Sequence, residues 1–165
     1  MSRIVLVEPT PTPPPIRFIY RPYVPLALLA VAAPLLRDGY EVRLIDQRLD
    51  ADWERSLLSA ITRDTLLVGI TSLTGSQLLH ALRASQLVKQ HTNLPVVWGG
   101  IHASRLPEQT IQDTHIDYVI QGEGEETIVE LARALEKGAS PAGIQGLWYK
   151  ENGQSRQNPC HRQLR

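Results

Sequence analysis

The chain has few of the residues that metal, disulfide and membrane functions require. Its 165 residues contain one cysteine, Cys160, in a polar segment near the end. One thiol excludes an internal disulfide framework and a multi-cysteine zinc or iron–sulfur site within these residues. The first apolar run, residues 4–7, is too short for a signal peptide or a membrane-spanning helix. We therefore expect a cytoplasmic protein with no membrane partner.

The chain also has no excess of positive or negative charge. Lysine and arginine number 17, and aspartate and glutamate also number 17. No net charge draws the protein to a polyanion, so a nucleic-acid partner is disfavoured.

Two motifs that would assign common functions are absent after the first apolar run. That run is followed by Glu8 and prolines instead of Gly-x-Gly-x-x-Gly, so a dinucleotide would lack its phosphate cradle, although Asp46 stands where such folds hold a ribose. A phosphoacceptor signalling domain would need clustered aspartates at this place, and Glu8 stands alone. The sequence therefore disfavours both dinucleotide binding and phosphoacceptor signalling.

Short apolar runs alternate with amphipathic helical segments along the chain. Runs buried on both faces and separated by helices are typical of a parallel sheet. We predict an α/β fold, a doubly wound sheet of five parallel strands with a short extra edge strand at 144–149. The predicted strands are residues 4–7, 42–45, 66–70, 96–98 and 118–120, and the predicted helices are 25–39, 51–62, 75–91, a short one near 107–113, and 125–137.

The chain length fits one compact domain. We place this domain at residues 1–153 and expect residues 154–165, which are polar and patternless, to be a linker or a truncated tail. Pro34 is expected to kink or shorten the first helix. Asn152-Gly153 indicates a turn.

Glycines follow two of the predicted strands, at Gly99-Gly100 and at Gly122-x-Gly124. The carboxyl ends of parallel strands are where open α/β sheets bind ligands, and glycine permits close approach of another molecule. Seven of the 12 prolines lie between positions 9 and 25, in a loop that leaves the same edge of the sheet. This loop is either a ligand lid or a solvated connection.

Several short segments, in this order and spacing, carry a resemblance to a known family. They are Val24-Pro25-Leu26-Ala27-Leu28-Leu29, Gly39-Tyr40-Glu41-Val42, Ile45-Asp46, Val68-Gly69-Ile70-Thr71-Ser72, Trp98-Gly99-Gly100-Ile101-His102-Ala103, Pro107-Glu108, Asp117-Tyr118-Val119-Ile120, Gly122-Glu123-Gly124-Glu125 and Ile144-Gln145-Gly146-Leu147. From about residue 4 to 153 the chain resembles the cobalamin-binding domain at the front of B12-binding radical SAM proteins. That group includes many methyltransferases and the anaerobic protoporphyrin ester cyclase type.

The resemblance implies a flavodoxin-like, or Rossmann-like, sheet of order 2-1-3-4-5. The corrin would lie over the carboxyl ends of the strands, with its nucleotide tail inserted into the protein. Ser72 and Thr74 would face the tail, and Gly99-Gly100 would leave room for the dimethylbenzimidazole. Leucine at Gly99 or Gly100 is expected to abolish cobalamin binding without unfolding the sheet. The implied cofactor-binding residues are Ser72, Leu73, Thr74, Gly99, Gly100, Ile101, His102, Gly122, Glu123 and Gly124.

The chain departs from cobalamin proteins that hold cobalt through a histidine. Their Asp-x-His-x-x-Gly motif is replaced here by residues 8–13, Glu-Pro-Thr-Pro-Thr-Pro, and no histidine precedes His80. The resemblance then implies base-off cobalamin without a protein histidine ligand. The loop residues expected to cover the cobalt face are Ile16, Arg17, Phe18 and Tyr20.

Two groups near the predicted rim have competing interpretations. His102 would contact a corrin amide or the tail, or is simply a polar residue of the rim. Glu123, Glu125 and Glu126 stand at the start of a predicted helix, where negative charge and capping are favoured over acid–base chemistry. Carboxylates there also disfavour a phosphate on that helix start.

By this resemblance the chain is a cobalamin-binding module of a B12-dependent radical SAM enzyme, a methyltransferase or one with related radical chemistry. S-adenosylmethionine and a [4Fe-4S] cluster would be held by a missing C-terminal barrel domain, in cis or in trans, because one cysteine cannot supply three ligands. We assign no catalytic residue and no metal ligand to these residues. The alternative is a non-catalytic Rossmann-like interaction domain that has lost the cofactor.

Overall fold

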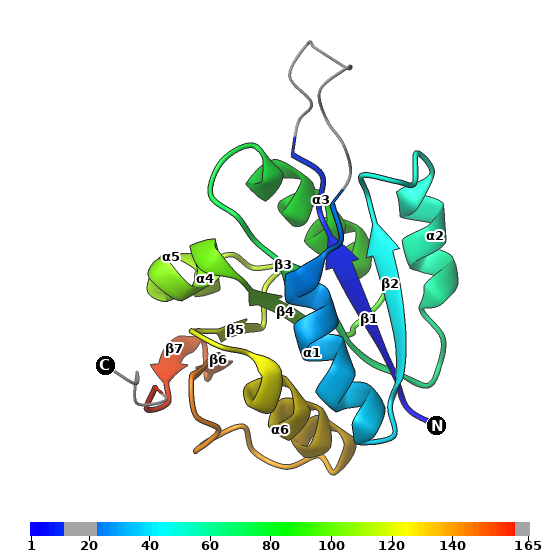
Figure 1. The fold of residues 1–165 in the computed structure, drawn as a ribbon. Coiled ribbons are helices and arrows are strands. Elements are labelled where there is room, and N and C mark those ends of the chain that lie inside the picture. The colour runs from blue at the N-terminus through cyan, green and yellow to red at the C-terminus, as the bar shows by residue number, and fades with distance from the viewer. Residues whose placement is uncertain (12–22, 161–165) are drawn as a thin grey trace.

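The computed structural model describes residues 1–11 and 23–160, which form one sheet covered by helices on both faces (Figure 1). The elements, in chain order, are β1 (Arg3–Glu8), α1 (Leu26–Arg37), β2 (Glu41–Asp46), α2 (Trp53–Ala60), β3 (Thr65–Thr71), α3 (Gln77–His91), β4 (Val96–Gly99), α4 (Ile101–Arg105), α5 (Pro107–Ile111), β5 (Tyr118–Ile120), α6 (Glu125–Glu136), β6 (Leu147–Glu151) and β7 (Gln154–Gln157).

The sheet has the strand order β2-β1-β3-β4-β5-β6-β7. The pairs among β1 to β5 are parallel, whereas β6 pairs with β5 and β7 with β6 in the antiparallel direction. This confirms the predicted five-stranded parallel sheet of order 2-1-3-4-5. In Figure 1 the carboxyl ends of β1 and β2 are at the top of the sheet.

Two apolar layers hold the helices to the sheet. One layer contains Leu28 and Leu35 of α1 and Ile128 of α6, and the other contains Leu57 of α2 and the buried apolar residues of α3. Side chains of β3 alternate between the layers, as they must in a strand. Val68 and Ile70 join the α2 and α3 layer, whereas Leu67 joins the α1 and α6 layer.

The end of the sheet differs from the sequence prediction. Residues 154–157, expected to begin a linker or truncated tail, instead form β7, so the segment predicted as an edge strand is covered by a further strand. Asn152 and Gly153 have φ of 53° and 77°, which suits a tight hairpin turn. The predicted turn is confirmed, but β7 was not predicted because the residues beyond the turn are polar.

Two helices also differ from expectation. The structure adds α4 directly after Gly100, where no helix was predicted. Helix α1 continues through Pro34 to Arg37. Proline removes the backbone donor that would pair with the carbonyl of Ala30, so α1 lacks one hydrogen bond between residues 30 and 34 but is not broken there. In the described ranges, 1–11 and 23–160, no helix combines the length and apolarity needed to span a membrane.

Candidate functional site

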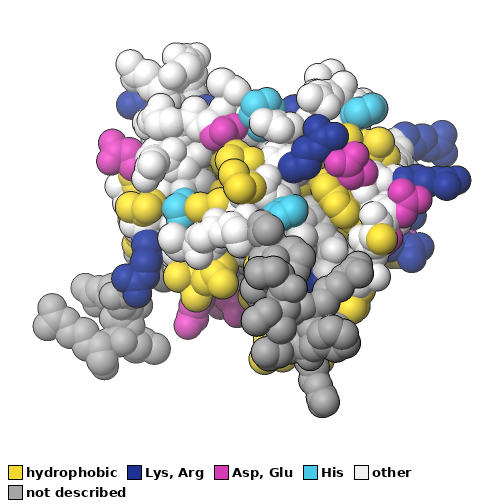
Figure 2. Space-filling model, turned by 90° about the horizontal axis from the view of Figure 1, so that it is seen from above, with side chains coloured by type: hydrophobic (Ala, Val, Ile, Leu, Met, Phe, Trp, Pro, Cys, Tyr) yellow, Lys and Arg dark blue, Asp and Glu magenta, His cyan; other side chains and the backbone are white. Residues whose placement is uncertain are grey.

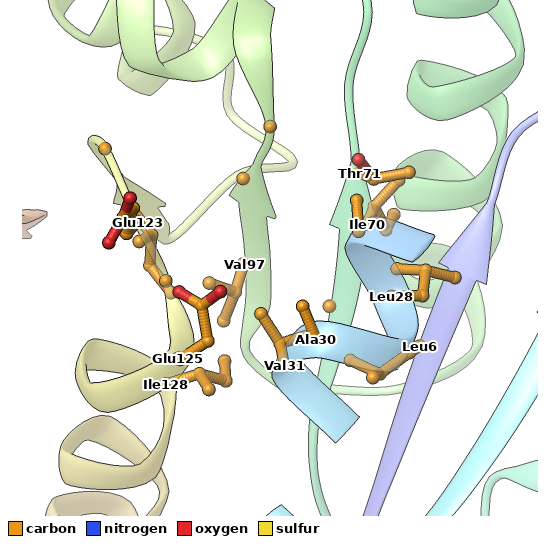
Figure 3. Close-up of a pocket in the computed structure, with 17 residues that line it drawn as sticks. Leu6, Leu28, Ala30, Val31, Ile70, Thr71, Val97, Glu123, Glu125 and Ile128 are labelled. Carbon is orange, nitrogen blue, oxygen red and sulfur yellow. The ribbon is translucent and has the colours of Figure 1, made fainter. Parts of the chain in front are cut away.

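A cleft of about 190 Å³ opens at the carboxyl ends of the parallel strands, between α1 and α6. Figure 3 shows Val31 of α1 and Ile128 of α6 pointing toward the space between the two helices, beside β4. Its walls are mostly apolar. The lining residues are Leu6, Ala27, Leu28, Ala30, Val31, Gly69, Ile70, Thr71, Val97, Gly99, Gly100, Ile120, Gly122, Glu123, Gly124, Glu125 and Ile128.

The adjacent glycines 99 and 100 serve different purposes. A Cβ at Gly99 would meet no atom within 4 Å, so the absence of a side chain there leaves free space in the cleft. Gly100 has φ of +91°, and a Cβ there would lie 2.8 Å from the carbonyl oxygen of Ser72 and from Thr71 Oγ1. Gly100 is therefore required for the close approach of the two loops. Leucine at Gly100 would therefore strain these loops as well as enter the cleft, whereas leucine at Gly99 would only enter the cleft.

The hydroxyl that lines the cleft belongs to Thr71, at the end of β3 (Figure 3). Ser72, predicted to face the tail, is 1% exposed and is not among the cleft residues. Its Oγ donates to Gly99 O (2.7 Å) and accepts from the Ala103 N–H (3.2 Å). Ser72 thus fixes the Gly99 turn and the start of α4.

Thr71 was not among the residues predicted from the sequence, although the alternation of side chains along β3 indicates it. Leu67 faces α1 and α6, and residues two apart in a strand share a face. Gly69 and Thr71 therefore face the cleft, and Ser72 falls on the opposite side. Helix α1 was likewise not predicted to contribute, but Ala27, Ala30 and Val31 form one wall.

Four other predicted residues lie on the rim outside the lining of the cleft. Leu73 and Ile101 are 45% and 58% exposed. Thr74 Oγ1 lies 3.2 Å from His102 Nδ1, which joins the β3–α3 loop to α4. Figure 2 views this end of the molecule from above and shows apolar side chains exposed among uncharged ones over its middle.

The predicted residues Gly122, Glu123 and Gly124 form the mouth of the cleft on the β5 side. Gly122 has φ of +90°. Glu123 and Glu125 also line the cleft, with Glu125 in the first turn of α6. Their negative charge is favoured by the helix dipole and makes this side of the mouth unsuitable for a phosphate.

A buried polar cluster joins the ends of β1 and β2 to the start of α3. Gln77 Nε2 donates to Glu8 Oε1 (3.2 Å) and to Pro9 O (2.8 Å), and its Oε1 accepts from the Leu73 N–H (2.7 Å). Burial raises the pKa of the Glu8 carboxyl, and the nearby Arg48 opposes that shift. This cluster fixes two of the loops at the upper edge of the sheet.

Side chains of the metal-ligating types are scattered. Among residues 1–11 and 23–160, no group of three histidine, cysteine, aspartate or glutamate side chains is placed to hold a metal ion. Ile16, Arg17, Phe18 and Tyr20, predicted to cover the cobalt face, lie outside the described residues.

Comparisons with known proteins agree with this geometry. The family model for the B12 binding domain matches residues 18–132. An uncharacterized methyltransferase of Pyrococcus horikoshii is 38% identical over 163 residues, which cover 96% of this chain and 35% of the relative. The anaerobic magnesium-protoporphyrin IX monomethyl ester cyclase of a Synechocystis strain is 25% identical over 134 residues, 79% of this chain and 27% of the relative.

A solved structure extends the match to three dimensions. The radical S-adenosylmethionine methyltransferase TsrM from Kitasatospora setae, with cobalamin and a [4Fe-4S] cluster bound, superimposes with a TM-score of 0.80 at 28% identity. The match covers 100% of this chain and 30% of TsrM, so the chain spans about a third of the length of these relatives. The chain belongs to the B12-binding domain family, and its domain resembles those of cobalamin-dependent radical SAM methyltransferases.

Proposed function

We propose that the chain is the cobalamin-binding module of a B12-dependent radical SAM enzyme and that the cleft between α1 and α6 receives the nucleotide tail of the cofactor. The observation that carries this proposal is the free space at Gly99, the last residue of β4, in a mostly apolar cleft at the carboxyl edge of the sheet. Such an opening accepts a flat heteroaromatic group against the backbone.

The size of the cleft supports insertion of the tail alone. Pockets that enclose a whole drug-sized ligand measure roughly 300–1,000 Å³. The cleft, at about 190 Å³, is smaller and open at its mouth. It suits a two-ring base, while the much larger corrin remains outside over the rim.

The polar groups of the site suit a base with few hydrogen-bonding atoms. Thr71 offers one hydroxyl in an otherwise apolar wall, and this hydroxyl can donate to a ring nitrogen of the base. Glu123 and Glu125 repel the phosphate from the α6 side, so the phosphate falls toward the pair of Thr74 and His102.

Cobalamin, when bound, supplies the cobalt chemistry that moves a methyl group or generates a related radical. The chain itself binds the tail, orients the corrin and shields the base from water. We propose that binding is base-off and without a protein histidine ligand, because no histidine precedes His80 in the sequence.

The remaining functions belong to other parts of such an enzyme. We place S-adenosylmethionine and the [4Fe-4S] cluster in a radical SAM domain in cis or in trans, since the relatives are about three times as long as this chain. We also propose that the protein is cytoplasmic, because a reducing compartment suits an iron–sulfur partner.

The test is retention of hydroxocobalamin by the chain and by two leucine variants after anaerobic incubation and desalting. The visible spectrum should show near-stoichiometric corrin on the wild type and none on Gly99→Leu, because the leucine fills the cleft. Ala139→Leu adds the same side chain in the exposed loop after α6, at the opposite end of that helix, and should bind normally.

Two outcomes would contradict the proposal. Normal retention by a folded Gly99→Leu variant would show that the tail does not use this cleft. Absence of corrin on the wild type would instead support the alternative, a non-catalytic interaction domain that has lost the cofactor.

A further inference from the structure

One glutamine holds the cleft mouth from the outside. Gln121 directly precedes the turn at residues 122–124, which lines the mouth. Its Oε1 accepts hydrogen bonds from Trp148 Nε1 (2.9 Å) and from Cys160 Sγ (3.0 Å), and its Nε2 donates to Ser104 O (3.4 Å). The side chain therefore contacts three separate segments of the chain.

Ser104 extends this connection to the other glycine turn. Its Oγ accepts a hydrogen bond from the Gly122 N–H (3.0 Å). Ser104 belongs to α4, which starts directly after Gly100 and is fixed to the β3–α3 loop through Ser72 Oγ and the Ala103 N–H. The turns at 99–100 and 122–124 are thus tied to each other beside the cleft.

Trp148 fixes the glutamine from the side of the hairpin formed by β6 and β7. Trp148 pairs with Val119 of β5 in the sheet, and its side chain packs against the apolar layer of α2 and α3. The indole N–H is consequently held in one place. The B12-binding family model ends at residue 132, so this hairpin lies outside the matched part of the chain.

We propose that Gln121, held by Trp148, is a positioning residue that sets the shape of the cleft mouth, so that the β6–β7 hairpin determines how tightly the cobalamin tail is bound. This inference rests on the proposed function, because it assumes that the tail enters the cleft. Part of the affinity for the tail would then come from a segment beyond the residues that the family model matches.

The experiment compares two ligands on three variants. Cobalamin carries the nucleotide tail, whereas cobinamide is the same corrin without it. Gln121→Leu and Trp148→Phe should each weaken cobalamin binding by about 2- to 12-fold, the effect of one hydrogen bond, and leave cobinamide binding unchanged. Trp53→Phe makes the same ring change on α2 and should alter neither affinity.

A second measurement does not require any cofactor. Hydrogen exchange of the Gly122 amide, whose acceptor is Ser104 Oγ, should accelerate in both mouth variants, because Gln121→Leu removes the contact with Ser104 and Trp148→Phe loosens the glutamine that makes it. Exchange in β1 should stay at the wild-type rate, which shows that the sheet remains folded.

The outcomes separate this inference from the proposed function. If Gln121→Leu and Trp148→Phe bind cobalamin as tightly as the wild type does, Gln121 does not position the tail. The same conclusion follows if the two variants lose as much affinity for cobinamide as for cobalamin. In either case the inference fails and the proposed function stands. If the wild type binds no cobalamin, the proposed function fails and the inference fails with it.

Discussion

At the residue scale, the free space above Gly99 and the crowding around Gly100 separate two effects that a substitution can have. A side chain at Gly99 enters the cleft, whereas one at Gly100 meets the backbone of Ser72 at 2.8 Å. The first position therefore reports on the ligand and the second on the fold.

We predict that Gly100→Ala destabilises the protein. A non-glycine residue at φ of +91° costs roughly 1–2 kcal/mol, and the contact with the Ser72 backbone adds to that cost. Urea unfolding should show a lower free energy of unfolding for Gly100→Ala and little change for Gly99→Ala, its matched control. Equal stabilities of the two variants would mean that the loops separate easily.

We predict that Thr71→Val weakens cobalamin binding and that Thr71→Ser retains most of it. Valine keeps the shape but removes the hydroxyl, which is worth about 0.5–1.5 kcal/mol or roughly 2- to 12-fold in affinity. Equilibrium titration followed by the corrin absorbance measures the effect. A valine variant that binds like the wild type would mean that the base does not hydrogen-bond to Thr71.

The residues of the site were only partly predictable from the sequence. Gly99 and the 122–124 turn were found because glycine after a buried strand has a direct structural meaning. Thr71 was missed in favour of Ser72 because both are hydroxyl residues at a strand end, and only the face of the strand distinguishes them. That face depends on the register of the whole strand.

At the scale of elements, the cluster of Glu8 and Gln77 joins β1 to α3 at the cost of burying a carboxyl. Glu8 is 4% exposed, and burial raises its pKa above the usual value near 4.5. The folded chain therefore binds the Glu8 proton more tightly than the unfolded chain does. The resulting stabilisation is complete below the unfolded pKa and is lost as the pH rises through the folded pKa.

This gives a pH-dependent prediction for Glu8→Gln. Glutamine keeps an acceptor for Gln77 and cannot ionise, so the variant should gain stability relative to the wild type as the pH rises from 4 to 7. The free energies of unfolding of both proteins, measured in urea at several pH values, provide the test. A constant difference across this range would show that Glu8 has the same pKa in both states.

The elements that the sequence failed to predict share one physical property. Helix α4 has five residues and β7 has four, and neither contains enough apolar residues to show a periodicity. Both are stabilised by tertiary contacts, α4 through Ser72 and β7 through its pairing with β6. Local pattern predicts elements that bury a face of their own, such as β1 and α6, and overlooks those completed by their neighbours.

At the scale of the whole molecule, cofactor binding and folding are linked. A ligand that binds only the folded chain adds RT ln(1 + [L]/Kd) to its stability, about 2.7 kcal/mol at a concentration of 100 Kd. For a domain of 165 residues this corresponds to a rise in Tm of about 5–11 °C. We predict such a rise when cobalamin is added to the wild-type chain.

The leucine variants turn this rise into a test of the site. Gly99→Leu should melt at a temperature that cobalamin does not change, because the occupied cleft excludes the tail, while Ala139→Leu should show the full rise. A shift that survives in Gly99→Leu would place the stabilising contacts on the rim and not in the cleft. The protein would then bind cobalamin through contacts with the corrin alone, and cobinamide would stabilise the chain as much as cobalamin does.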